Sequence, residues 1–280
     1  MTVRHLAVTT YQCKLDRNKL PAVAHAWSTQ VVRDYAPIWG ISATVTVFPT
    51  LASIQRHPAA GRLWPVVIMD DIGVAGASGV HEDSHGRPLA LVDYDGSDSW
   101  TLTGSHEVIE MLTDPLGTRT VAAPSPVAAQ GQVNFLIEPC DPSEADAYAY
   151  AIDGVRVSDF YLPAFLTGNG TGSLSHTGAL NRPRQILPGG YLSWQVPSTN
   201  EWWQATYFGS SVEVHNLGAS TARNPRRHTN RTRAPREIFR PGPSFDDGLP
   251  QVRDMHPSAA LPLSAAQLQI DVEAIISGAR

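Results

Sequence analysis

The segment 101–115 contains three residues whose side chains can bind a metal or transfer a proton: His106, Glu107 and Glu110. An imidazole and a carboxylate four residues apart lie on one helix face, one turn above the other. His106 and Glu110 therefore predict two ligands of a metal site, with Glu107 beside them as a candidate general base. The alternative is a polar helix face with an ordinary salt bridge.

The sequence around these residues predicts a single helix of about four turns. Thr101, Thr103 and Ser105 can each accept a hydrogen bond from a free N–H of the first turn. Pro115 prevents the residue before it from continuing the helix. Apolar residues at helical spacing predict the face that packs on a core, namely Val108, Ile109 and Leu112.

A helical His-Glu-x-x-His motif holds a metal through two imidazoles, and its glutamate takes a proton from the attacking water. In this chain Glu110 stands where that motif has its second histidine. A carboxylate ligand shifts the preference toward harder cations and makes a bound water less acidic. The predicted cofactor is a divalent metal, zinc foremost, with Mn²⁺ or Ca²⁺ as alternatives. The change weakens the prediction of catalysis more than that of metal binding.

A third ligand must come from another segment of the chain. Asp114 lies roughly 12 Å along the axis from His106, because a helix rises about 1.5 Å per residue, so it is better interpreted as a helix-end residue. Glu138 and Asp141 follow a predicted strand in a proline-flanked turn and are the candidate ligands; the alternative is ordinary turn chemistry. Cys140 between them is a soft donor or a buried structural thiol.

The first 115 residues predict strands and helices in the order strand, helix, strand, strand, strand, helix. The helix at 16–35 has apolar residues at helical spacing and is expected to end at Pro37 and Gly40. The strands are expected at residues 5–11, 41–48, 63–69 and 88–94, with a loop at 73–79. This order predicts an α+β (α/β-like) fold with a mixed sheet, a long N-terminal helix and a site helix.

The second half is predicted to be mostly β or irregular. A strand is expected at 133–137, a hairpin at 148–157 with its turn at Asp153-Gly154, and further strands within 191–214. Tryptophans of that last region are expected in a core, with a sugar-stacking surface as the alternative. The glycines of 167–172 are interpreted as a flexible turn rather than a phosphate loop.

These patterns divide the chain into three predicted segments. Residues 1–216 form the predicted main domain, divided into 1–115 and 116–216, and 217–262 form an Arg/Pro-rich linker. Arginines at 223–240 indicate a solvated linker, with weak nucleic-acid binding as the alternative. Residues 263–280 predict a short amphipathic helix that docks on the protein, or alternatively binds a partner.

The composition fits a globular protein, with 42% hydrophobic and 17% charged residues among 280. The net charge of −5 argues against a nucleic-acid-binding protein as a whole. Two cysteines argue against a disulfide scaffold and fit a reducing compartment. The sequence has no secretion signal and no apolar run of about 18 residues, so we expect a cytoplasmic protein that does not contact membranes.

The segment Gly104-Ser-His-Glu-Val-Ile-Glu, after strands and a helix in this order, resembles the zincin metallopeptidases over about residues 5–115. The resemblance implies that His106 and Glu110 are metal ligands, that Glu107 is the base, and that the edge-like strand 88–94 aligns a peptide or protein substrate. No standard zincin third-ligand pattern follows downstream.

A closer resemblance, over about residues 5–215, is to a group of largely uncharacterised bacterial proteins. The shared motifs are at 36–40, 105–115, 138–142, 157–160 and 188–194. This resemblance names no reaction. Two hypotheses therefore remain: a zincin-like metal-dependent hydrolase, foremost a peptidase, or an inactive zincin-shaped binding or structural protein. The sequence specifies neither the substrate nor the oligomeric state.

Overall fold

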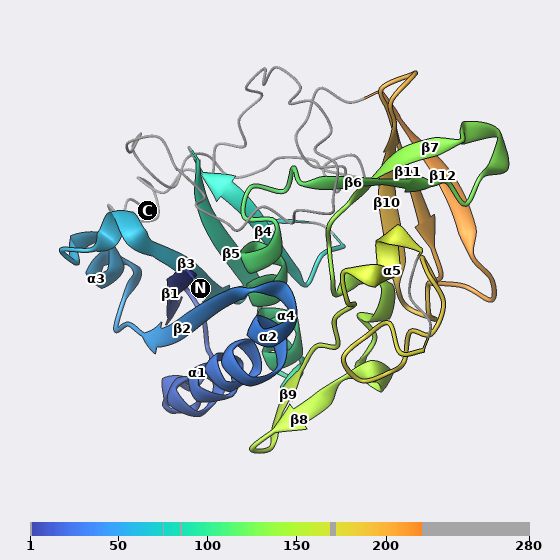
Figure 1. Cartoon of the computed structure of the whole chain (residues 1–280). Helices are drawn as coiled ribbons and strands as arrows, with labels where there is room; N and C mark the ends of the chain where they lie inside the picture. Colours follow the sequence, from blue (N-terminus) through green and yellow to red (C-terminus); the bar gives the residue numbers. More distant parts are fainter. Residues whose placement is uncertain (1, 75, 85, 169–171, 220–280) are drawn as a thin grey trace.

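The computed structural model describes residues 2–219 except 75, 85 and 169–171. Its first half is built on a five-stranded sheet, sheet A, with strand order β2-β1-β3-β5-β4 (Figure 1). Four strands are parallel, and β4 pairs antiparallel with β5. The strands are β1 (Thr2–Thr10), β2 (Ile41–Val47), β3 (Leu63–Met69), β4 (Gly79–Ser84) and β5 (Arg87–Asp93). The mixed sheet confirms the predicted α+β fold class.

The predicted edge strand is wrong. Residues 88–94 were expected at the edge, but β5 lies between β3 and β4. The segment 79–84, for which the sequence predicted no strand, forms β4 and occupies the edge instead. Its sequence lacks the apolar run of the central strands, although its side chains His81, Glu82 and Ser84 are buried.

The long N-terminal helix is confirmed as one continuous helical run. It comprises α1 (Leu20–Thr29), a π-helix (Gln30–Tyr35) and α2 (Ala36–Trp39). Pro37 does not end it, and it lies where the bonding pattern changes from the π-helix to α2. Gly40 ends the run with φ 74°, a left-handed conformation that favours glycine.

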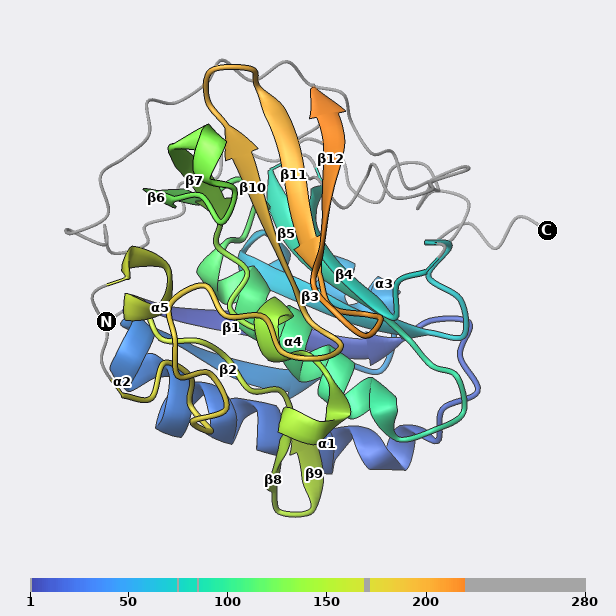
Figure 2. The ribbon, with the colours of Figure 1, turned by 90° about the vertical axis from the view of Figure 1, so that its right-hand side faces the viewer.

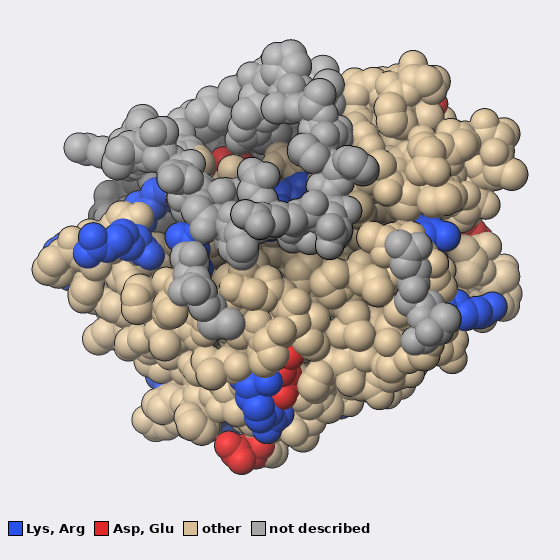
Figure 3. Space-filling view, viewed as in Figure 1, with Lys and Arg blue, Asp and Glu red and all other residues tan. Residues whose placement is uncertain are grey.

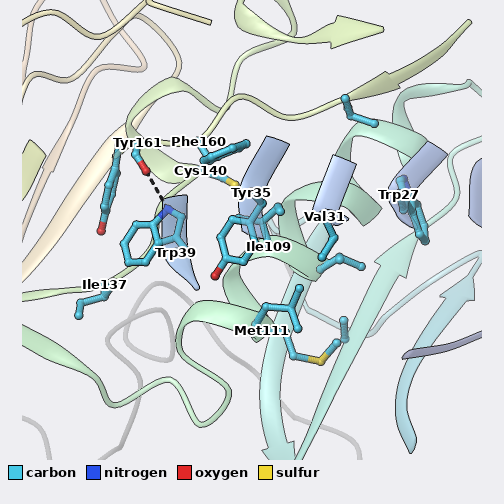
Figure 4. Close-up of a cluster of buried hydrophobic side chains, with 14 of the residues drawn as sticks. Trp27, Val31, Tyr35, Trp39, Ile109, Met111, Ile137, Cys140, Phe160 and Tyr161 are labelled. Atoms are coloured by element: carbon cyan, nitrogen blue, oxygen red, sulfur yellow. Dashed lines mark hydrogen bonds between the residues drawn. The ribbon is translucent and has the colours of Figure 1, made fainter. Parts of the chain in front are cut away.

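Helices cover both faces of sheet A. On one face α1 and α4 (Ser99–Thr113) pack over a large core that includes Trp27, Tyr35 and Ile109 (Figure 4). On the other face α3 (Leu51–Arg56) packs over a smaller cluster. Short 3₁₀ turns complete the connections at Arg17–Lys19, Ala60–Arg62, Ala128–Gln130, Asp141–Ser143 and Asp146–Tyr148.

The helix α4 lies at the centre of the molecule (Figure 2). It packs on β4 and β5 on one side and on β9 on the other. The predicted apolar face is confirmed, since Val108, Ile109 and Leu112 are fully buried. The predicted capping is wrong: Ser105 Oγ and Thr101 Oγ1 instead donate to backbone carbonyls. Thr101 also bonds the carbonyl of Arg156, and Ser105 accepts the N–H of Ser158. A pattern within 101–115 cannot indicate these contacts with the second half of the chain.

The second half contains an antiparallel sheet, sheet B, with strand order β12-β11-β10-β7-β6. Its strands are β6 (Thr120–Pro124), β7 (Gln132–Leu136), β10 (Tyr191–Val196), β11 (Glu201–Thr206) and β12 (Glu213–Ala219). The predicted hairpin is confirmed as β8 (Tyr150–Ile152) and β9 (Val155–Val157), followed by α5 (Ala164–Thr167). Its turn residues Asp153 and Gly154 have φ of 51° and 80°, as a two-residue hairpin turn requires.

Trp194 and Trp202 are buried, in agreement with the core interpretation of the tryptophans. Strand β12 continues to Ala219, two residues beyond the predicted start of the linker at 217. The arginine-rich segment and the C-terminal amphipathic helix lie outside the described residues.

Among the described residues, no helix combines the length and apolar character needed to cross a bilayer. Cys13 and Cys140 are both free thiols. On the face shown in Figure 3, the charged side chains of the described residues are scattered among uncharged ones.

Candidate metal centre

The predicted ligands His106 and Glu110 of α4 lie next to Asp141, one of the two acids predicted downstream. His106 Nε2 lies 3.1 Å from Glu110 Oε2 and 3.2 Å from Asp141 Oδ1. Asp141 begins a 3₁₀ turn that follows β7 and folds back over α4. Glu138 belongs to the same place, since one oxygen from each of Glu110, Glu138 and Asp141 lies within 4.8 Å of the others. The structure thus brings together all four predicted ligands.

Cys140 fixes the orientation of Glu110. Its backbone N–H donates to Glu110 Oε1 at 3.2 Å, which leaves Oε2 directed toward the imidazole of His106. The Cys140 sulfur also lies within 4.8 Å of ligand atoms of His106 and Glu110. Burial, together with the charge of Glu110, raises the pKa of the Cys140 thiol well above its ordinary value. A bound metal would be needed to hold it as a thiolate.

A second histidine, which the sequence interpretation missed, comes from the edge strand β4. His81 is fully buried, and its Nδ1 lies 3.4 Å from Glu107 Oε2 and 3.5 Å from Glu110 Oε2. Its Nε2 lies 3.8 Å from Glu138 Oε1. The signal that could have found it is the hairpin formed with β5, in which Asp83 bonds the backbone of Gly86 at the turn.

Burial sets the electrostatics of the centre. The exposed fractions are 0% for His81 and Glu110, 1% for Asp141, 2% for Glu107, 3% for Glu138 and 7% for His106. Burial alone would lower the pKa of His106, but the carboxylates of Glu110 and Asp141 outweigh it and hold that pKa well above its ordinary value. The centre therefore favours positive charge, whether it comes from a proton or a cation.

Glycines make room for two of the acids. A Cβ on Gly79 would lie 2.7 Å from Glu107 Oε1, so the start of β4 packs directly on this carboxylate. A Cβ on Gly190 would lie 2.4 Å from the carbonyl oxygen of Pro142 and 2.8 Å from that of Asp141. The 188–194 motif thus supports the turn that carries Asp141.

The 157–160 motif also has a structural role. The Ser158 N–H donates to Ser105 Oγ at 2.7 Å, and the Ser158 carbonyl accepts from Gln30 Nε2 at 2.8 Å. The Asp159 carboxylate accepts from Ser143 Oγ at 3.1 Å, two residues beyond Asp141. These bonds join the N-terminal helical run, α4 and the Asp141 turn.

Asp114 is a helix-end residue, as predicted. Its carboxylate accepts hydrogen bonds from the backbone N–H groups of Thr118 and Arg119 at 3.0 and 2.8 Å. Burial raises the pKa of Asp114 to about 6, although these bonds act against the shift.

The spacing of the side-chain atoms fits a metal ion. Ligand atoms about 2.0–2.1 Å from a tetrahedral zinc lie roughly 3.3–3.4 Å from one another. The four separations around Glu110 Oε2, His106 Nε2 and His81 Nδ1 range from 3.1 to 3.5 Å. The buried His, Glu, Asp and Cys groups could therefore hold a metal ion.

Comparison of the chain with known protein families, with curated proteins and with solved structures gives no match.

Proposed function

We propose that this protein is a metal-dependent hydrolase whose divalent cation is held by His106, Glu110 and Asp141, with Glu138 beside them. The observation that carries the proposal is that two carboxylates flank one imidazole: His106 Nε2 lies 3.1 Å from Glu110 Oε2 and 3.2 Å from Asp141 Oδ1. In addition, one oxygen from each of Glu110, Glu138 and Asp141 lies within 4.8 Å of the others. Zinc is the proposed ion, because an imidazole and a neighbouring thiol favour it over harder cations. Mn²⁺ and Ca²⁺ are the alternatives that the carboxylates favour.

A divalent cation at this position supplies a water of lowered pKa and polarises a carbonyl group. Glu107 is the proposed general base. Its carboxylate lies between α4 and β4, and His81 Nδ1 is 3.4 Å from its Oε2. His81 therefore orients the oxygen while the backbone of Gly79 limits the movement of the side chain.

The proposed substrate is a peptide or protein, as the zincin resemblance of the sequence implies. Support comes from the position of β4, which lies at the edge of sheet A and contributes His81 to the centre. An edge strand offers backbone groups with which an extended peptide can pair. The proposed aligning strand is β4, in place of the segment 88–94.

A structural metal centre is the second candidate, and burial favours it. None of the six side chains that form the centre is more than 7% exposed. A closed centre fits a metal that stabilises a fold, whereas a catalytic metal keeps an open position for water. In this case the cation would join α4, β4 and the Asp141 turn without turnover.

The deciding experiment combines elemental analysis with a cleavage assay on an unfolded protein substrate. The hydrolase proposal expects bound divalent metal, and cleavage that Glu107→Gln abolishes while the circular dichroism spectrum is unchanged. Glu213→Gln, on an exposed residue of β12 far along the chain, is the matched control and should retain activity. Metal without cleavage would support the structural candidate, and metal-free protein after reconstitution would contradict both.

A further inference from the structure

We propose that the centre binds a second divalent cation through His81, Glu107 and Glu110, next to the one held by His106 and Asp141. This inference rests on the proposed metal-dependent function and extends it to a two-cation centre. The three side chains come from β4 and α4, and their ligand atoms lie within 4.8 Å of one another.

The two histidines belong to different sets of ligand atoms. Within the described part of the chain, His81 groups with Glu107 and Glu110, whereas His106 groups with Glu110 and Cys140 or with Asp141 and Glu144. Glu110 is common to both sides, with Oε2 3.5 Å from His81 Nδ1 and 3.1 Å from His106 Nε2. A carboxylate between two imidazoles can bridge two cations, which in two-metal sites lie about 3.5–4 Å apart.

The ring of His81 is oriented as a metal ligand would be. Its Nδ1 faces Glu107 and Glu110, while its Nε2 lies 3.8 Å from Glu138 Oε1 on the other side. Metal-binding histidines commonly direct their second ring nitrogen to a carboxylate, which fixes the tautomer and the ring orientation. Glu138 lies on this second side of the ring, at a separation longer than a hydrogen bond.

Glu107 has little freedom to turn away from His81. A Cβ on Gly79 would lie 2.7 Å from its Oε1 and 2.9 Å from its Cγ, so the backbone of β4 confines the carboxylate. Its Oε2 is the oxygen that lies 3.4 Å from His81 Nδ1. The second cation uses this oxygen.

The charge of the centre favours two cations. Glu107, Glu110, Glu138 and Asp141 are all at most 3% exposed, and each carries one negative charge when ionised. Burying a carboxylate is unfavourable unless positive charge compensates it. With neutral imidazoles, two divalent cations balance these four carboxylates, whereas a single cation leaves half of their charge.

The experiment measures bound zinc per chain in the full-length protein. One sample of metal-depleted protein is reconstituted with Zn²⁺, desalted and analysed by elemental mass spectrometry. A second metal-depleted sample is titrated with Zn²⁺ by calorimetry. We expect about two equivalents in the wild type and about one in both His81→Ala and Glu107→Gln. The isosteric Glu107→Gln serves if His81→Ala fails to fold. His25→Ala, on an exposed α1 side chain, is the control and should keep two.

The outcomes separate this inference from the function on which it rests. One equivalent in the wild type, unchanged in both variants, would overturn the second site and leave the hydrolase proposal intact. Two equivalents that persist in both variants would place the second ion elsewhere and overturn the assignment. No bound zinc would overturn the inference and the proposed function together.

Discussion

At the scale of single residues, Glu110 connects the parts of the centre. One of its oxygens accepts the Cys140 N–H, and the other lies between the imidazoles of His81 and His106. In the motif that this helix resembles, a histidine at this position would add an imidazole ligand. A carboxylate offers two oxygens instead, so one can be oriented by the backbone while the other faces both histidines.

Asp114 gives a residue-scale prediction about pH. Its folded pKa of about 6 lies above the ordinary 3.8, so between these values the folded protein keeps a proton that the unfolded chain releases. Stability from this group is therefore present below pH 4 and lost as pH rises through 6. The shift corresponds to about 3 kcal/mol in the free energy of unfolding.

Asp114→Asn removes this titration. Urea unfolding at about pH 4 and pH 7 should show the wild type losing about 3 kcal/mol relative to the variant across that interval. Subtracting the variant cancels the titration of acids that do not interact with Asp114, whereas the charge of His81 does interact with it and lowers its pKa. A difference between the two proteins that does not change with pH would contradict the raised pKa.

At the scale of elements, α4 depends on a close approach to α1. Trp27 donates its indole N–H to the Thr101 carbonyl oxygen at 3.0 Å, and its ring lies against Gly104. A Cβ on Gly104 would lie 2.2 and 2.3 Å from two ring carbons of Trp27. The glycine immediately before Ser105 and His106 is therefore required by packing, although it lies inside a helix.

Gly104→Ala should destabilise the protein. An alanine in a helix interior usually gains about 0.5–1 kcal/mol over glycine, but the clash with a fully buried tryptophan should cost about 1–3 kcal/mol. Thermal or urea unfolding measures the net loss. Gly61→Ala is the control, because nothing lies within 4 Å of the added Cβ. A more stable Gly104→Ala protein would show that Trp27 can move.

Elements with a clear local pattern are the ones that the sequence could predict. The helix α4, the strands β1 to β3 and the hairpin β8–β9 follow from local periodicity and turn residues, so their patterns alone predict them. Glu138 and Asp141 were found because a strand followed by a proline-flanked turn limits where the chain can go. His81 was missed because its position depends on the pairing of β4 with β5, for which the turn residues Asp83 and Gly86 are the signal in the sequence.

At the scale of the whole molecule, the centre joins parts that are distant in the sequence. Its side chains come from β4, from α4 and from the turn after β7, so they connect sheet A with the half that contains sheet B. Bonds of Ser105, Ser158 and Asp159 reinforce the same junction. A cation bound here would make contacts that the unfolded chain cannot make, and its binding energy would add to the stability of both halves.

Metal binding should therefore raise the melting temperature of sheet A, α4 and sheet B together, in one transition. A cation at about 100 times its dissociation constant adds about 2.7 kcal/mol, which for a domain of this size corresponds to roughly 5–11 °C. Differential scanning calorimetry with increasing Zn²⁺, and with a chelator, measures the shift. Near-ultraviolet circular dichroism reports the buried aromatic side chains of both halves together, among them Trp27 of α1 and Trp194 of sheet B, and should show one transition at the same temperature. Glu110→Gln should abolish the response to Zn²⁺, because it removes the side chain common to both imidazoles. Two separate transitions, only one of which responds to the cation, would mean that the centre stabilises sheet A and α4 without coupling them to sheet B.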